Sequence, residues 1–273
     1  MTADDPGSST TLPGANDELI VTQDGSVRRM TLNRSARRNA LSRSLVAALH
    51  DAIASIAVGG ETRVAILDGA GAVFCAGGDI AEFSASTGGE QARADADGLV
   101  DLLAAIVACP VPVVARVHGA AYGGGVGLLC GADIVIAADG TAFSLSEARL
   151  GLVPAVVGPY VFAALGIREA KARMLLATPF GVDEALRSGL IHRAVPMEDL
   201  AAATDEVVAS LLRGAPGALD DIKRFPALVA GFDPAATRDA MAALLVERLG
   251  GDEAREGLRA FLEKRPASWV ETR

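Results

Sequence analysis

The fold is decided by residues 111–131, VPVVARVHGAAYGGGVGLLCG, where one apolar run leads through three glycines into another. The first run is typical of a buried strand and the second of a buried helix. A triple glycine gives up backbone entropy and side-chain packing, so its position needs a reason. Two reasons are open here. The glycines either let the helix pack closely, or they bring the free N–H groups of its first turn to an anionic group.

Composition limits the class of protein. The chain has 273 residues, of which 51% are hydrophobic and only 4% aromatic, so Ala, Val, Leu and Ile must build the core. A net charge of −9 argues against a general nucleic-acid binder and against adsorption to an anionic membrane. Any anionic ligand must therefore meet a local basic cluster. The three cysteines and three histidines lack metal-ligand spacing, so we expect no metal, and buried reduced thiols suit a cytoplasmic protein.

The pattern of elements divides the chain into three parts. Residues 1–16 are polar and rich in Gly, Pro, Ser and Thr, without the features of a signal peptide, and we expect a disordered leader. Residues 17–199 alternate between strand and helix patterns, which indicates an α/β core with parallel pairing. Residues 200–273 are helical in pattern. Their apolar positions, Met241, Leu244, Leu245, Leu258 and Phe261, need either the core or another subunit as a partner.

Individual elements follow from local signals. Asp24-Gly25 predicts a hairpin turn, and Ser42 predicts a helix N-cap. The expected strands are 19–22, 27–32, 63–67, 111–117 and 134–138. The expected helices begin at Ser42, at Ile80 and after Gly125, and cover 99–107, 200–212, 216–229, 235–249 and 252–264.

Three further segments carry polar or small residues at the ends of strands. The turn 33–41, NRSARRNAL, is basic and is either a solvated loop or an anion contact. Residues 74–80, FCAGGDI, expose backbone N–H groups just before a helix that Asp79 could cap. Residues 143–154, FSLSEARLGLVP, contain Glu147 in an apolar stretch. Such a glutamate is more often paired, here with Arg149, than catalytic.

Together these segments resemble the crotonase family, the enoyl-CoA hydratases and isomerases, over roughly residues 18–264. The order CAGGD (75–79) followed by HGAAYGGG (118–125) carries the resemblance. It implies ββα turns in a superhelix, a C-terminal helical part that builds a homotrimer or a dimer of trimers, and a coenzyme A thioester as substrate. It also implies an oxyanion hole formed by the N–H groups of Gly78 and Gly124. Fixed N–H donors there would stabilise the negative charge that grows on the thioester oxygen.

The sequence departs from the two-glutamate hydratases at one position. The second family glutamate falls on Glu147, but the first falls on Gly127. Glu147 could then handle water alone in a hydratase, or shuttle a proton between carbons in an isomerase, or remain in a decayed acyl-CoA binder. Residues 120–127 and 144–161 are similar to the branch of methylglutaconyl-CoA and isohexenylglutaconyl-CoA hydratases, which also has glycine there. That similarity favours a hydratase, and the glycine suggests space for a branched or carboxylated acyl group.

The resemblance also implies the residues that contact the substrate. Arg38 corresponds to the family residue along the CoA phosphates, with Arg34 and Arg37 as neighbours that assist it or are simply solvated. Lys264 resembles a C-terminal lysine that reaches CoA, although a cation favoured by the end of its helix explains it equally well. No cofactor is expected beyond the CoA of the substrate. The expected contacts with substrate or CoA are Arg38, Ala40, Ala76, Gly77, Gly78, Asp79, Ile80, Tyr122, Gly124, Gly127, Pro154 and Lys264.

Overall fold

A six-stranded sheet with the order β1-β2-β3-β4-β6-β8 forms the centre of the computed structural model, which describes residues 12–85, 89–228 and 234–270. Only β1 and β2 pair antiparallel; the remaining neighbours pair parallel, as the alternating pattern predicts. A second sheet pairs β5 with β7 in parallel. The strands are β1 (Leu19–Asp24), β2 (Val27–Leu32), β3 (Val64–Gly69), β4 (Val113–Val117), β5 (Ala120–Tyr122), β6 (Ile134–Ala138), β7 (Ala142–Ser144) and β8 (Arg193–Val195).

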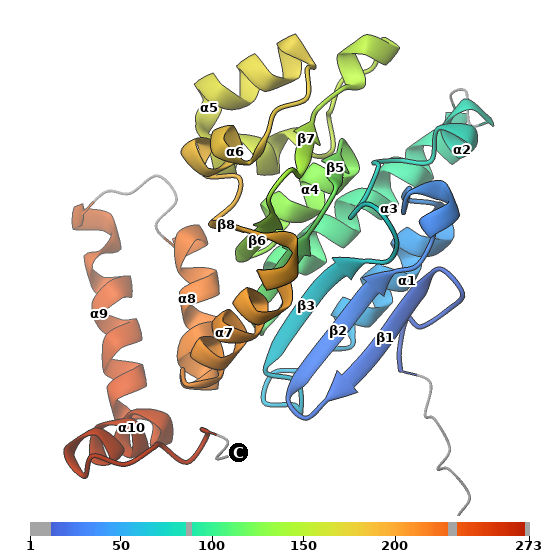
Figure 1. Ribbon diagram of the computed structural model, residues 1–273. Helices are drawn as coiled ribbons and strands as arrows, with labels where there is room; N and C mark the ends of the chain where they lie inside the picture. The colour runs from blue at the N-terminus through green and yellow to red at the C-terminus, as the bar shows by residue number, and fades with distance from the viewer. Residues whose placement is uncertain (1–11, 86–88, 229–233, 271–273) are drawn as a thin grey trace, which may run out of the picture.

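Helices cover both faces of the large sheet (Figure 1). They are α1 (Arg43–Ala54), α2 (Ile80–Ala85), α3 (Gly89–Ala108), α4 (Gly124–Gly131), α5 (Gly158–Leu176), α6 (Val182–Ser188), α7 (Leu200–Leu212), α8 (Pro216–Leu228), α9 (Pro234–Gly250) and α10 (Asp252–Leu262). The expected N-cap is confirmed, because the Ser42 hydroxyl accepts a hydrogen bond from the N–H of Leu45 at 3.1 Å. The predicted C-terminal helices agree closely with α7 to α10, although residue 229 lies outside the described residues.

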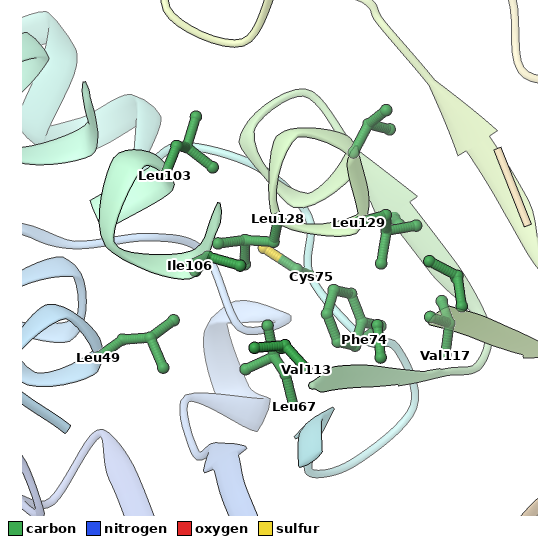
Figure 2. Close-up of a cluster of buried hydrophobic side chains, with 14 of the residues drawn as sticks. Leu49, Leu67, Phe74, Cys75, Leu103, Ile106, Val113, Val117, Leu128 and Leu129 are labelled. Carbon is green, nitrogen blue, oxygen red and sulfur yellow. The ribbon is translucent and has the colours of Figure 1, made fainter. Parts of the chain in front are cut away.

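The main core lies between the sheet and helices α1, α3 and α4. Figure 2 shows Phe74 and Cys75 at its centre, among leucines, isoleucines and valines from these elements. All six residues of β3 are buried, as expected for a parallel strand covered on both faces. A smaller cluster on the opposite face joins Ile66 and Val114 to Leu200 and Ala203 of α7. The aliphatic core that composition predicts is therefore divided by the sheet into two layers.

The N-terminal boundary differs from the expected one. Residues 1–11 of the predicted leader lie outside the described residues, but residues 12–16 pack against α1. Leu12 and Ala15 contact the main core, and the Asn16 amide donates to the Ser44 hydroxyl at 3.3 Å. A Cβ on Gly14 would lie 2.2 Å from the Ala48 carbonyl oxygen. Short polar and small residues look like a leader in the sequence, but here they allow the backbone to approach the helix.

The C-terminal helices do not bury their apolar positions within the chain. Leu245, Leu249 and Leu258 are exposed, and the side chain of Phe261 is 80% accessible to solvent. Figure 1 shows α9 standing beside α8 and α10 at the far end from α2 and β5. Of the two partners expected for this apolar face, the core of the same chain does not cover it, which leaves another subunit. Among residues 12–85, 89–228 and 234–270, no helix has the length and apolar content to cross a bilayer.

Candidate active site

The loop 75–79 is held as a short extended segment between two others. On one side, the Cys75 N–H donates to the Ala120 carbonyl at 3.1 Å, and the Tyr122 N–H donates to the Cys75 carbonyl at 3.0 Å. On the other side, the Leu41 N–H donates to the Gly77 carbonyl at 2.8 Å. The predicted loop thus has backbone partners on both flanks, and its peptide groups have fixed directions.

The chain leaves this arrangement at the triple glycine. Gly123 has a φ of +48°, which favours glycine, and it directs the backbone into α4. Gly125 packs so closely that a Cβ would lie 2.8 Å from the Cys75 carbonyl oxygen. The position of a Cβ on Gly124 lies 3.9 Å from the Gly78 nitrogen. Close packing therefore accounts for Gly125 and, against the Leu41 side chain, for Gly124, while the backbone of Gly124 also passes close to the Gly78 nitrogen.

Gly78 and Gly124 contribute these two N–H groups. Neither donates a hydrogen bond to another residue of the described part of the chain. Gly124 is the first residue of α4, where N–H groups have no partner within the helix and carry the positive end of its dipole. Two unpaired donors on neighbouring backbone segments can bind an oxyanion if both face the same point.

Glu147 reaches the same place from a different segment. β7 pairs with β5, and the Gly123 N–H donates to the Ser144 carbonyl at 2.9 Å. Glu147 follows in the next turn, and its Oε1 lies 3.1 Å from where a Cβ on Gly123 would be. A side chain at position 123 would therefore meet the carboxyl group, and glycine leaves that approach open.

The carboxyl group of Glu147 is not held by an ion pair. Its Oε2 is buried without a hydrogen-bond partner, and Arg149, exposed in the same turn, forms no ion pair with it among the described residues. Burial raises the pKa of Glu147 above its ordinary value, and a hydrogen bond from its own backbone N–H only partly offsets this. The alternative that Glu147 is paired with Arg149 is therefore not supported. A half-buried carboxyl group with a raised pKa suits proton transfer.

The other predicted contacts are distributed around this centre. The Ala76 N–H donates to the Arg38 carbonyl at 2.9 Å, and the Arg38 side chain is exposed, as is that of Arg37. Ile80 is exposed at the start of α2. The Pro154 carbonyl accepts a hydrogen bond from Gly158 at the start of α5, at 2.8 Å.

The predicted space at Gly127 does not exist. A Cβ there would lie 2.5 Å from Cγ1 of Val157, which is buried at the start of α5. Sequence reasoning missed this because Val157 is 30 residues away and no pattern joins α5 to α4. The wall that carries a glutamate in two-glutamate hydratases is apolar here.

Lys264 is not brought to the site of its own chain. It follows α10 by two residues, and Figure 1 shows α10 at the lower end of the molecule, away from β5 and α4 near its centre. A contact between Lys264 and CoA would require the site of another subunit.

A cavity of about 360 Å³ opens beside Gly78, between α1 and α3. Leu41, Val46 and Leu99 form part of its apolar lining. Its charged lining is mostly acidic: Asp51, Asp79, Glu82, Asp95 and Asp101, with Arg43 as the arginine among them. The Arg43 side chain is itself paired with Asp95. The cavity therefore offers apolar surface surrounded by negative charge.

Comparison with known proteins identifies the family. The profile described as enoyl-CoA hydratase/isomerase matches residues 22–272. The chain belongs to this family. It is 38% identical over 244 residues to a probable enoyl-CoA hydratase of Rhodobacter capsulatus, covering 87% of this chain and 91% of that protein. The resemblance inferred from the glycine segments is thus confirmed for the family, though the nearness to methylglutaconyl-CoA hydratases is not.

A solved structure supports the fold, and a second sequence relative supports the class of enzyme. The structure of Pseudomonas aeruginosa AtuE has a TM-score of 0.88 and 35% identity, over 93% of this chain and all of that chain. The mevalonyl-coenzyme A hydratase sidH of Aspergillus fumigatus is 30% identical over 248 residues, covering 88% of this chain and 90% of that protein. The protein is therefore an enzyme of the enoyl-CoA hydratase/isomerase family with the crotonase fold.

Proposed function

We propose that this protein adds water to a 2-enoyl-CoA thioester, with Gly78 and Gly124 as oxyanion donors and Glu147 as the sole carboxylate. The observation that supports it best is that the half-buried Glu147 carboxyl group, with Oε2 lacking a partner, lies against Gly123, next to the unpaired N–H of Gly124 and near the unpaired N–H of Gly78. Coenzyme A enters as part of the substrate, and no separate cofactor takes part.

The chemistry follows from the positions of these groups. Water adds to the β-carbon of the enoyl group, and negative charge moves to the thioester oxygen to form an enolate. Two N–H groups at that oxygen stabilise the charge without reorganising. Glu147 accepts the proton of the attacking water as general base, and a proton then reaches the α-carbon from water or from protonated Glu147.

An isomerase is the second candidate, and the apolar wall at Gly127 supports it. Because Val157 fills the position of the first glutamate, no second carboxylate holds the water from that side. One carboxylate is sufficient to take a proton from the α-carbon of a 3-enoyl thioester and return it to the γ-carbon, which shifts the double bond to the 2-position. The number of glutamates alone does not separate the two reactions, but their products differ by one water.

Incubation with a panel of enoyl-CoA thioesters tests the function. Hydration removes the absorbance of the conjugated enone and adds the mass of one water. Isomerisation of a 3-enoyl-CoA creates that absorbance at constant mass. Binding of acyl-CoA without either change would instead show a decayed, non-catalytic binder.

We also propose an uncharged acyl group, in contrast to the carboxylated one that the sequence suggests. Besides the similarity of residues 120–127 and 144–161 to glutaconyl-type hydratases, free space at Gly127 is the sequence argument for a bulky or carboxylated group, and Val157 occupies that space. The cavity beside Gly78 has five carboxylates in its lining, which outnumber their cationic partners Arg34 and Arg43, so an anionic tail that entered it would meet net negative charge. In the panel, hex-2-enoyl-CoA should be hydrated faster than 3-methylglutaconyl-CoA; the reverse order would restore the glutaconyl-type substrate.

A homotrimer or a dimer of trimers remains part of the proposal. The exposed leucines of α9 and α10 and the exposed Phe261 form an apolar face that another copy of the chain would cover. Light scattering should give about three or six chain masses. A stable monomer would remove both the assembly and the idea that Lys264 serves a neighbouring CoA.

A further inference from the structure

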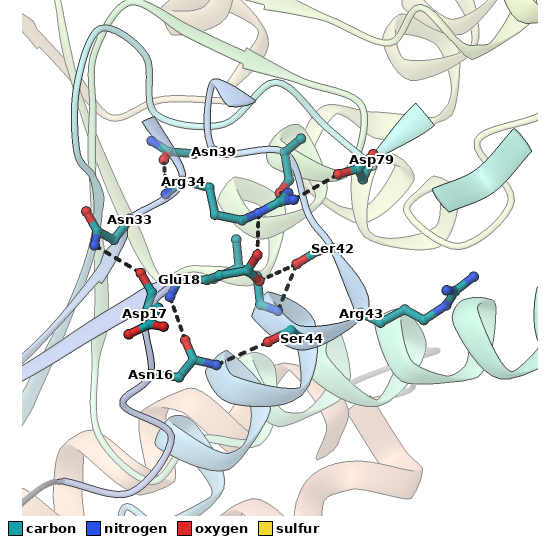
Figure 3. Close-up of polar contacts among 12 residues, drawn as sticks. Asn16, Asp17, Glu18, Asn33, Arg34, Asn39, Ser42, Arg43, Ser44 and Asp79 are labelled. Atoms are coloured by element: carbon teal, nitrogen blue, oxygen red, sulfur yellow. Dashed lines mark hydrogen bonds and ion pairs between the residues drawn. The ribbon is translucent and has the colours of Figure 1, made fainter. Parts of the chain in front are cut away.

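Arg34 is the central residue of a polar network that joins three segments beside the site (Figure 3). Its Nε lies 2.6 Å from a Glu18 carboxylate oxygen, and its Nη2 lies 3.0 Å from Asp79 Oδ2. Its Nη1 donates to the carbonyl oxygen of Ala40. The side chain is only 14% exposed. Arg34 thus uses donors on all three of its nitrogens inside the protein.

The contact with Ala40 begins a chain of peptide groups. The carbonyl of Ala40 and the N–H of Leu41 belong to one peptide group, and this N–H donates to the Gly77 carbonyl at 2.8 Å. The Gly77 carbonyl and the Gly78 N–H belong to the next peptide group. In a trans peptide the C=O and N–H point in opposite directions. A guanidinium at Ala40 therefore connects, through two peptide groups in series, to the Gly78 N–H.

The far end of this chain is the unpaired Gly78 N–H described above. Because Leu41 fixes the carbonyl side of the Gly77–Gly78 peptide, the N–H side is directed away from Leu41, toward Gly124. Asp79 is fixed as well, since its N–H donates to the Leu41 carbonyl at 3.1 Å and its carboxylate pairs with Arg34. The hydrogen bonds of Gly77 and Asp79, the residues on either side of Gly78, thus fix the direction of the Gly78 N–H.

We propose that Arg34 is a positioning residue that orients and polarises the Gly78 N–H through the Ala40–Leu41 and Gly77–Gly78 peptide groups. Hydrogen bonds in series polarise one another, and a cation at the first acceptor makes the last N–H a stronger donor. The negative charge that grows on the thioester oxygen is then partly balanced by Arg34, without contact. This role rests on the proposed oxyanion hole at Gly78 and Gly124.

The same geometry separates Arg34 from Arg37 and Arg38. Those two side chains are exposed, whereas Arg34 is turned inward against Glu18, Asp79 and Ala40. Contact with the CoA phosphates is therefore assigned to the exposed arginines. The sequence leaves open that Arg34 assists the contact with the CoA phosphates. In this proposal Arg34 acts instead on the Gly78 N–H of the oxyanion hole.

The test compares Arg34→Met with Arg29→Met. Methionine has a similar length but no donor. Arg29 is a matched control because it lies on β2, the strand before the same turn, and pairs with Asp68 at 2.8 Å, outside the peptide chain. Two measurements are made: steady-state kcat and KM on the best 2-enoyl-CoA, and the infrared stretching frequency of the carbonyl of bound, ¹³C-labelled butanoyl-CoA. Butanoyl-CoA is saturated, so the second measurement does not depend on turnover.

Arg34→Met should lower kcat about tenfold, a fraction of the ~10²–10³ that a complete oxyanion donor contributes. KM should change less than about threefold, because the donor acts mainly on the charge of the transition state. The carbonyl frequency should move toward its value in water. Arg29→Met should change neither quantity. Arg34→Lys keeps the charge but cannot reach three partners at once, so both quantities should fall between those of wild type and Arg34→Met.

The proposal would be overturned if Arg34→Met had the kcat of wild type. It would also be overturned if Arg29→Met lost as much kcat as Arg34→Met and neither variant changed the carbonyl frequency. If Arg34→Met does not fold, the test rests on Arg34→Lys. A kcat and a carbonyl frequency equal to those of wild type in Arg34→Lys would then overturn the proposal. The infrared measurement also separates this proposal from the proposed function. A wild-type protein that does not shift the carbonyl frequency lacks the oxyanion hole, whereas a shift that survives in Arg34→Met removes only the role of Arg34.

Discussion

On the oxyanion side of the proposed centre, the backbone around Gly78 is hydrogen-bonded on both flanks, whereas on the acid/base side Glu147 has a carboxylate oxygen without any partner. The oxyanion donors are backbone groups whose directions depend on many contacts. The carboxyl group must instead change its charge during the reaction, and a strong partner would fix one charge state. The first half of the site is therefore rigid and the second is destabilised in its charged form.

Glu147→Gln tests the acid/base side and should have the largest effect on turnover. The amide keeps the size of the side chain but cannot accept the proton, so turnover should fall by ~10²–10⁴ while butanoyl-CoA still binds. Steady-state kinetics and calorimetry measure the two effects. Glu206→Gln, which removes only an exposed ion pair with Arg193, is the control. Near-normal turnover in Glu147→Gln would refute the assignment of the acid/base.

On the other side, Gly78→Pro removes one donor. Proline has no N–H, and one lost oxyanion donor is worth ~10²–10³ in kcat. Gly78→Ala retains the N–H and serves as the matched control for the shape of the loop. In a crystal structure with butanoyl-CoA, the nitrogens of Gly78 and Gly124 should lie about 2.7–3.1 Å from the thioester oxygen. An oxygen that points elsewhere would refute the site.

Substitutions at Gly127 test whether Val157 fills the space beside this glycine. Gly127→Ala should destabilise the protein by about 1–3 kcal/mol because the new methyl group would overlap Val157. Thermal unfolding of Gly127→Ala alone and together with Val157→Ala measures this. The second substitution should restore part of the stability; a Gly127→Ala variant as stable as wild type would show that the space is open after all. Gly127→Glu with Val157→Ala then asks whether a second carboxylate speeds hydration.

The smallest expected effect is on stability and depends on pH. Because burial raises the pKa of Glu147, the folded chain binds this proton more tightly than the unfolded chain does. The loss of folding stability caused by ionising Glu147 is absent below the pKa of this group in the unfolded chain. It grows as the pH rises through the pKa of this group in the folded chain. Glu147→Gln should therefore melt at a higher temperature than wild type at pH 8. The difference should shrink at pH 4. A difference that is the same at both values would contradict a raised pKa.

The sequence alone determined the family and the parallel α/β core and predicted three groups of the proposed centre, because these depend on local signals. Gly78 and Gly124 stand out since only glycine or another small residue permits such close backbone approach, and Glu147 stands out as an acid in an apolar run. The apolar runs of β3, β4 and β6 and the N-cap at Ser42 are also readable locally.

Only the tertiary structure decided what surrounds these groups, because those contacts join segments far apart in the chain. The three-residue strands β5 and β7 are too short to show a period, yet their pairing brings Glu147 to Gly123. Val157 fills the space at Gly127 from a different helix, and Arg149 does not pair with its neighbour. The link from Arg34 to Gly78 passes through backbone groups, whose directions no residue type encodes.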